Sequence, residues 1–114
     1  MITVKGINPK MIANNVEPFE PTHPGELLKE EIEYIGISQK KLAEQIGIPY
    51  KNLNDILNCR RPVTANTALL FEAALGISAN ILTKMQMDYN IQIAKKDKSF
   101  IERLANIRKI VAML

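Results

Sequence analysis

The strongest constraint on the fold of this chain is the close spacing of its helix stops. Gly36, Gly47 and Gly76 each follow a short segment whose apolar residues recur at helical spacing. Glycine readily takes the left-handed conformation that ends a helix, so each of these positions predicts a helix terminus. No segment shows the sustained apolar-polar alternation of a half-buried strand. The sequence therefore predicts an all-α fold built from short helices.

Capping residues refine the positions of these helices. Ser38, Thr64 and Ser78 each precede a helical segment, where a side-chain oxygen can accept a hydrogen bond from one of the first backbone amides. Ser99 and Glu102 have the spacing of a capping box, which predicts that a last helix begins at Ser99. The expected helices cover residues 24–35, 39–46, 49–58, 65–75, a stretch from 79 through at least 89, and 99–114.

The chain divides into one domain with two appendages, because 114 residues support one modest core. Residues 1–21 are interrupted by prolines and are expected to form an N-terminal arm. Residues 22–94 form the domain, in which the helix over 65–75 is apolar on most sides and is expected in the middle of the core. Residues 95–114 are expected to be a helical extension.

The composition argues against several classes of function. The sequence has no run of about 20 apolar residues and no basic, apolar leader, so we expect a cytoplasmic protein without a membrane partner. Cys59 and His23 are the only residues of their types, which excludes an internal disulfide and predicts neither a metal site nor a cofactor. No nucleophile accompanies His23 at catalytic spacing, so we do not expect an enzyme.

Charge is segregated along the chain, although the net charge is only +3. Residues 17–33 hold six acids and one lysine, whereas residues 38–61 hold five bases and two acids. Residues 95–109 hold six bases and two acids. The two basic segments favour an anionic partner, and an ordinary solvated surface is the alternative.

The segments 39–46 and 49–58 are typical of a helix-turn-helix, in which two short helices pack across a tight turn and the second enters the major groove of DNA. The turn is expected at Gly47. A plain antiparallel helical hairpin has the same periodicity and is the alternative. The apolar residues that would join the two helices are Leu42, Ala43, Ile46, Leu53 and Ile56.

Polar side chains occupy the positions from which a helix-turn-helix contacts DNA. The N-terminal half of the second helix carries groups that suit base edges, because Asn can pair with adenine and Lys can donate to guanine. The candidates for base readout are Tyr50, Lys51, Asn52 and Asn54. Residues at the start of the first helix and just after the second are expected to contact phosphates, namely Gln39, Lys40, Arg60 and Arg61. Holding the loop before Pro62 is the alternative role of Arg61.

Three segments resemble the HigA/VapI antitoxins, which belong to the larger Xre group of Cro/repressor-like regulators: THPGELL at 22–28, SQKKLA at 38–43 and RRPVTANTAL at 60–69. The resemblance implies a lambda-repressor-like helix-turn-helix bundle of about five helices. It also implies a homodimer that binds a palindromic operator upstream of its own operon and represses that operon. A HigB-like toxin, a RelE-like messenger RNA endonuclease, is the implied protein partner, which the antitoxin neutralises.

The resemblance further assigns roles to residues. It supports DNA contact by Gln39 and by the exposed face of the second helix, and it implies that a later helix forms the dimer through Ile81, Leu82, Met85 and Tyr89. Cys59 departs from the family pattern, which commonly has glycine there, and this puts the geometry of the following turn in doubt. Two other functions remain open: a free-standing Xre-type repressor without a toxin, and a protein-binding module that has lost DNA contact.

The last expected helix carries apolar residues with a seven-residue rhythm, namely Phe100, Leu104, Ile107, Val111 and Leu114. We expect this stripe to pack on the body or across a dimer, with contact to a toxin as the alternative. The neighbouring residues Lys95, Lys96 and Lys98 could instead extend the contact with DNA.

Overall fold

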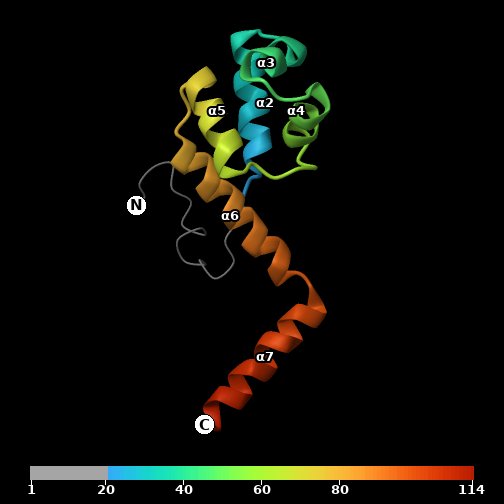
Figure 1. Cartoon of the computed structure of the whole chain (residues 1–114). Helices are drawn as coiled ribbons and strands as arrows, with labels where there is room; N and C mark the ends of the chain where they lie inside the picture. The colour runs from blue at the N-terminus through green and yellow to red at the C-terminus, as the bar shows by residue number, and fades with distance from the viewer. Residues whose placement is uncertain (1–20) are drawn as a thin grey trace, which may run out of the picture.

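The computed structural model describes residues 21–114, which form six helices and no strand (Figure 1). The helices are α2 (Pro24–Ile35), α3 (Gln39–Ile46), α4 (Tyr50–Leu57), α5 (Ala65–Leu75), α6 (Ala79–Lys95) and α7 (Lys98–Ala112). The all-α prediction is confirmed. The expected arm, residues 1–21, lies outside the described residues except for Pro21. No helix in the described range is both long and apolar enough to cross a membrane.

The helix bounds follow from the caps that the sequence predicts. Gly36, Gly47 and Gly76 take φ angles of 87°, 77° and 77° and end α2, α3 and α5. A hydroxyl caps each of α3, α5 and α6 by accepting a hydrogen bond from the backbone N–H three residues later, and the capping residues are Ser38, Thr64 and Ser78. Each cap satisfies a backbone donor that has no partner within its helix.

Helices α2 to α5 and the first part of α6 surround one apolar core (Figure 1). Its buried hydrophobic residues are Leu28, Ile32, Leu42, Ala43, Leu53, Ile56, Leu57, Val63, Ala68, Phe71 and Leu82. Burial of one Leu, Ile or Phe side chain stabilises a fold by about 1.5–3 kcal/mol relative to exposure. Three of the buried residues belong to α4, so the core fixes the orientation of that helix.

The prediction that the helix over 65–75 lies in the middle of the core is wrong. Only Ala68 and Phe71 of α5 are buried, and Leu69 is 56% exposed. One face of α5 packs on α3 and α6, while other apolar residues of the helix face outward. Because apolar residues occur all around this helix, its sequence did not indicate which face is buried.

The first turn of α2 lies directly against α4. A Cβ atom at Gly25 would overlap the backbone carbonyl oxygen of Ile56, so only glycine permits this approach. His23 caps α2, and its Nδ1 atom accepts a hydrogen bond from the Gly25 backbone N–H at 2.9 Å. The ring of Tyr89, on α6, stands edge-on to the His23 ring with the centroids 4.9 Å apart. The segment around His23 therefore joins α2 to both α4 and α6.

The C-terminal helix α7 extends away from the body after a bend that follows α6 (Figure 1). None of its residues is buried in the described part of the chain. Asp97 caps α7 by accepting a hydrogen bond from the Phe100 backbone N–H at 3.2 Å, so the helix begins at Lys98 and the predicted cap at Ser99 is wrong. The expectation that its apolar stripe packs on the body is also wrong, because the helix points outward. Packing across a dimer stays a prediction.

Candidate nucleic-acid interface

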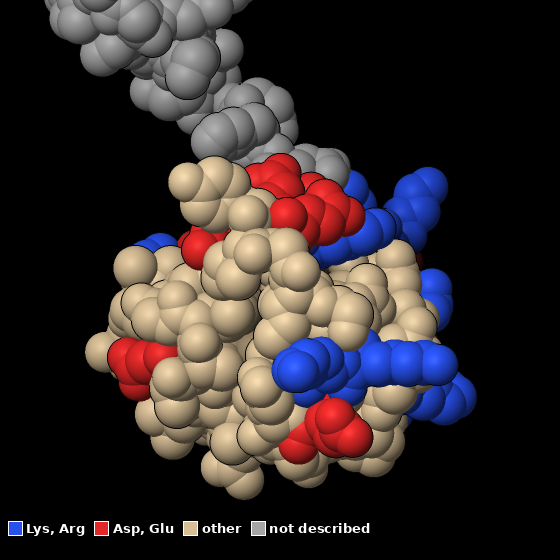
Figure 2. Space-filling model, turned by 90° about the horizontal axis from the view of Figure 1, so that it is seen from above, with Lys and Arg blue, Asp and Glu red and all other residues tan. Residues whose placement is uncertain are grey.

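The helix-turn-helix consists of α3, the turn at Gly47 and α4. The backbone N–H groups of Gly47 and Ile48 both donate to the carbonyl oxygen of Ala43, at 2.9 and 3.1 Å, and these bonds close the turn. Leu53 and Ile56 anchor α4 in the core. Lysine and arginine side chains gather on the side of the molecule that carries α4 (Figure 2). The helix thus has one buried face and one face in a basic surface.

Tyr50 and Lys51 are the most exposed of the four predicted base-reading residues. The side chain of Lys51 is 81% exposed, and Tyr50 is 45% exposed. The Nζ atom of Lys40, on α3, lies 5.8 Å from the centroid of the Tyr50 ring, within the range of a cation-π contact. The start of α4 therefore presents an aromatic ring and a flexible cation to solvent.

Asp55, a residue without a predicted role, joins two of the predicted DNA-contacting residues. Its Oδ2 atom accepts a hydrogen bond from Lys51 Nζ at 3.2 Å, and its Oδ1 atom accepts from Arg60 Nε and Nη2 at 3.2 and 3.1 Å. The hydrogen bond from Lys51, followed by that from Arg60, holds the pKa of the Asp55 carboxyl below its usual value, although partial desolvation opposes the shift. At neutral pH the carboxylate is ionised and pairs with both cations.

The side-chain amide of Asn54 is engaged through both of its polar atoms. Its Nδ2 atom donates to Gln39 Oε1 at 3.0 Å, and its Oδ1 atom accepts from Arg60 Nη2 at 3.1 Å. These bonds connect α4 to the start of α3 and to the loop after α4. Base readout by Asn54, as predicted, would require breaking them. In the structure Asn54 thus links Gln39 to Arg60, and base readout by Asn54 stays a prediction.

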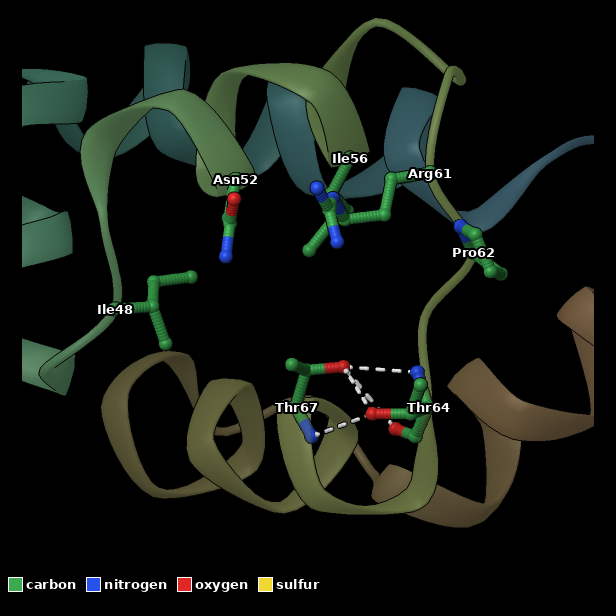
Figure 3. A pocket seen from close by; sticks show the side chains of 7 residues that line it. All are labelled: Ile48, Asn52, Ile56, Arg61, Pro62, Thr64 and Thr67. Carbon is green, nitrogen blue, oxygen red and sulfur yellow. Dashed lines mark hydrogen bonds between the residues drawn. The ribbon is translucent and has the colours of Figure 1, made fainter.

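Asn52 and Arg61 line a shallow pocket between α4 and the start of α5 (Figure 3). The pocket has a volume of about 260 Å³. Asn52 projects into it from α4, and the side chain of Arg61 extends beside Ile56 (Figure 3). Thr64, the N-cap of α5, and Thr67, in the first turn of α5, bound the pocket and bond to each other through a capping box. Asn52 is half-buried on the side of α4 that faces α5, so it is less accessible than Lys51.

Cys59 determines the course of the loop after α4. Its φ angle is 62°, in the left-handed region that favours glycine. The backbone N–H of Arg60 then donates to the carbonyl oxygen of Asp55 at 2.7 Å, which brings the Arg60 side chain beside the Asp55 carboxylate. Burial raises the pKa of the Cys59 thiol. Cys59 therefore adopts the backbone geometry that the family glycine would supply.

Comparison with known proteins identifies the family. The family model HTH_3, helix-turn-helix, matches residues 28–82. Virulence-associated protein I of Dichelobacter nodosus is 35% identical over 80 residues, which cover 69% of this chain and 74% of that protein. The structure of an addiction module antidote protein of the HigA family from Coxiella burnetii is 36% identical, with a TM-score of 0.66, and the match covers 75% of this chain and 95% of that chain. The chain belongs to the HigA/VapI family of helix-turn-helix antitoxins.

Another HigA/VapI structure, that of Pseudomonas aeruginosa antitoxin HigA, was determined with the higBA promoter. It is 26% identical to this chain, with a TM-score of 0.62, and the match covers 83% of this chain and 96% of that chain. These comparisons confirm the resemblance that the sequence motifs indicated. The roles of individual residues in DNA contact stay predictions.

The four residues that the HigA/VapI resemblance assigned to a dimer interface lie in different surroundings on α6. Leu82 is fully buried in the core of its own chain, so it cannot contact a second copy in this conformation. Met85 and Tyr89 are half-buried, and Tyr89 packs on His23. Ile81 is 53% exposed. Leu82 thus has a core role, and a dimer contact through the other three residues stays a prediction.

Two polar residues that support the interface had no predicted role. Asp55 lies four residues after Lys51, and this spacing on one helix was the available signal for their ion pair. Gln86 is buried on α6, where its Oε1 atom accepts from the Val63 backbone N–H at 2.8 Å and its Nε2 atom donates to Asn90 Oδ1 at 2.9 Å. Gln86 ties the loop between α4 and α5 to α6. No sequence spacing indicates this long-range bond.

Proposed function

We propose that this chain is the antitoxin of a type II toxin-antitoxin system, which binds its own operator as a homodimer, represses its operon and neutralises a HigB-like toxin. The observation that carries the DNA-binding part is the exposed start of α4, where Tyr50 and Lys51 lie beside Lys40 and Arg60. A recognition helix presents its first residues to base edges in this way. The HigA structure with the higBA promoter supports this part by similarity.

The residues of the interface divide into three roles under this proposal. Tyr50, Lys51 and Asn52 read base edges, with Asn52 reaching the groove from the side of α4 that faces α5. Phosphates are contacted by Gln39, Lys40, Arg60 and Arg61, which flank the recognition helix. Asn54 holds Gln39 and Arg60 in place and would have to break these bonds to read a base.

A homodimer fits the exposed apolar side chains of α6. Ile81, Met87 and Ile91 are 53%, 57% and 45% exposed, and a second copy would cover such residues. A twofold dimer presents the same surface twice, so two recognition helices about 34 Å apart would read both halves of a palindrome. Occupation of the promoter by this dimer would repress the operon.

The DNA-binding part is tested by mobility shift and footprinting on a labelled duplex from the region directly upstream of the gene that encodes this chain. We expect a palindromic footprint and an affinity at least about a thousandfold higher than for a scrambled duplex at the same salt concentration. A chain that binds neither duplex would be a protein-binding module that has lost DNA contact, and a chain that binds both equally would not recognise an operator. Either result would contradict the proposal.

The toxin part is tested separately, by co-expression with any toxin-sized protein encoded next to the chain. We expect the two proteins to purify as a complex and the cells to resume growth. Intact operator binding without a complex and without rescued growth would identify a free-standing repressor. If the complex forms, removal of residues 1–20 and of residues 98–114, one segment at a time, shows which end contacts the toxin.

A further inference from the structure

One carboxylate lies at the centre of the residues assigned to DNA contact. Asp55 accepts hydrogen bonds from both Lys51 and Arg60, Arg60 also bonds to Asn54, and Asn54 bonds to Gln39. We call these five residues the Asp55 clamp. The Asp55 side chain is only 16% exposed, beneath the more exposed side chains of Lys51 and Arg60. The clamp thus spans α3, α4 and the loop after α4.

We propose that Asp55 is a specificity-determining residue of this interface, which holds Lys51 and Arg60 in the geometry that suits the operator and lowers the affinity for all other DNA. The inference rests on the DNA-binding function proposed above. It assigns a role to an acidic residue, whereas the roles proposed so far belong to basic and neutral side chains.

The effect on other DNA follows from electrostatics. Non-specific binding comes mainly from lysine and arginine side chains that neutralise phosphates, and its strength depends on the number of cations available. Asp55 lies within hydrogen-bonding distance of both cations, so it competes with phosphates for them. Its own negative charge also repels the backbone of any DNA that approaches α4. A duplex that offers only phosphates therefore binds weakly.

The effect on the operator follows from geometry. Arg60 is held at its Nε and Nη2 atoms by one carboxylate oxygen, and Nη2 also donates to Asn54. A side chain that is already fixed loses less conformational entropy when it binds. Base recognition depends on correctly placed donors, so fixing Lys51 favours the sequence whose acceptors match its position, while fixing Arg60, which contacts phosphate, holds α4 in one register on the duplex.

The test compares Asp55→Asn with Asp88→Asn. Asp88, on α6, also pairs with a lysine four residues earlier, Lys84, at 3.0 Å, so both changes remove one negative charge from the same kind of pair. Binding of the full chain to the footprinted operator duplex and to a scrambled duplex is measured by fluorescence anisotropy over a range of salt concentrations.

For Asp55→Asn we expect scrambled DNA to bind about three- to tenfold more tightly, because one more cation is free for phosphate. We expect the ratio of operator to scrambled affinity to fall about tenfold, since Lys51, the base-contacting cation, is no longer held by the carboxylate. The salt dependence on scrambled DNA should become steeper by up to about one unit of slope. Asp88→Asn should leave the ratio unchanged within about twofold.

An equal loss of affinity for both duplexes would show that Asp55 is merely structural, and an unchanged ratio would also overturn the proposal. The same change of the affinity ratio in Asp88→Asn would show that the effect comes from the net charge of the protein and not from the position of Asp55. Circular dichroism checks that each variant is folded, and Asp55→Glu, which keeps the charge, must keep the low affinity for scrambled DNA. If the parent chain shows no preference for the operator, the proposed function itself is contradicted. If the parent chain prefers the operator and Asp55→Asn keeps the same preference, only the role of the Asp55 clamp is contradicted.

Discussion

Helices α4 and α7 both carry an apolar stripe, but the stripe of α4 is buried in the core and that of α7 is not. Three of the eight residues of α4 are buried, and its polar side chains bond to α3 and to the following loop. Helix α7 is fifteen residues long, and none of them is buried in the described range. An isolated helix of this length is marginal in water. The described residues up to α6 thus form a complete core without α7, and we expect another molecule to cover the apolar stripe of α7.

Two phenylalanines provide the sharpest test of this difference. Phe71 is fully buried in the core, whereas Phe100, on α7, is 39% exposed. We expect Phe71→Ala to lower the free energy of unfolding by about 3–5 kcal/mol, because it removes core contacts and leaves a cavity. Phe100→Ala should change it by less than about 0.5 kcal/mol. Chemical denaturation at a protein concentration too low for dimerisation measures both values, and similar losses in the two variants would contradict the comparison.

A substitution at the contact between α2 and α4 is expected to have a smaller effect on stability. Gly25→Ala adds a Cβ atom that would overlap the carbonyl oxygen of Ile56, so α4 must shift. We expect the free energy of unfolding to fall by about 1–3 kcal/mol, as in other overpacked sites. Thermal unfolding measures the change, and Glu30→Ala on the exposed side of α2 is the control. A Gly25→Ala variant as stable as the control would show that α2 does not position α4.

The smallest expected effect depends on pH. Burial lowers the pKa of His23 below its ordinary value of 6.5, although Glu26 partly opposes the shift. The unfolded chain therefore takes up the proton more readily than the folded chain. The stability contributed by the neutral ring is fully present above about pH 6.5 and is lost as the pH falls through the lower pKa of the folded state. We expect the melting temperature to fall between pH 7.5 and 5.5, measured by calorimetry.

His23→Asn supplies the control for this pH dependence. An asparagine oxygen can cap α2 at the same position but does not titrate. The difference in melting temperature between the two pH values should therefore be smaller in this variant than in the parent chain. An equal difference in both would assign the pH dependence to other groups.

The sequence predicted the elements whose signals are local. The glycines at 36, 47 and 76 and the caps at Ser38, Thr64 and Ser78 act within one turn of the chain, and the structure confirms them. The bounds of α3 and α5 therefore matched closely. The family motifs likewise lie in contiguous segments, so they indicated the family before any tertiary contact was known.

The features of the structure that the sequence did not indicate depend on tertiary contacts. Leu82 carries an apolar side chain at a position that suits a dimer, and only the packing of α6 shows that it faces the core of its own chain. Base readout by Asn54 stays a prediction, but the bonds of Asn54 to Gln39, fifteen residues away, and to Arg60, beyond the helix end, are not visible in the sequence. Asp97 and Ser99 can both cap a helix, and the sequence spacing alone did not show that Asp97 is the N-cap of α7.

The most direct test of DNA reading by the exposed start of α4 is the binding of a Lys51→Ala variant to operator and scrambled duplexes. Lys84→Ala is the matched control, because Lys84 also pairs with an aspartate four residues later and is similarly exposed, but lies on α6. We predict that Lys51→Ala lowers the operator preference by about 1–3 kcal/mol, while Lys84→Ala does not change it. An equal loss of affinity for both duplexes in Lys51→Ala, or an unchanged preference, would contradict base reading by Lys51 at the exposed start of α4.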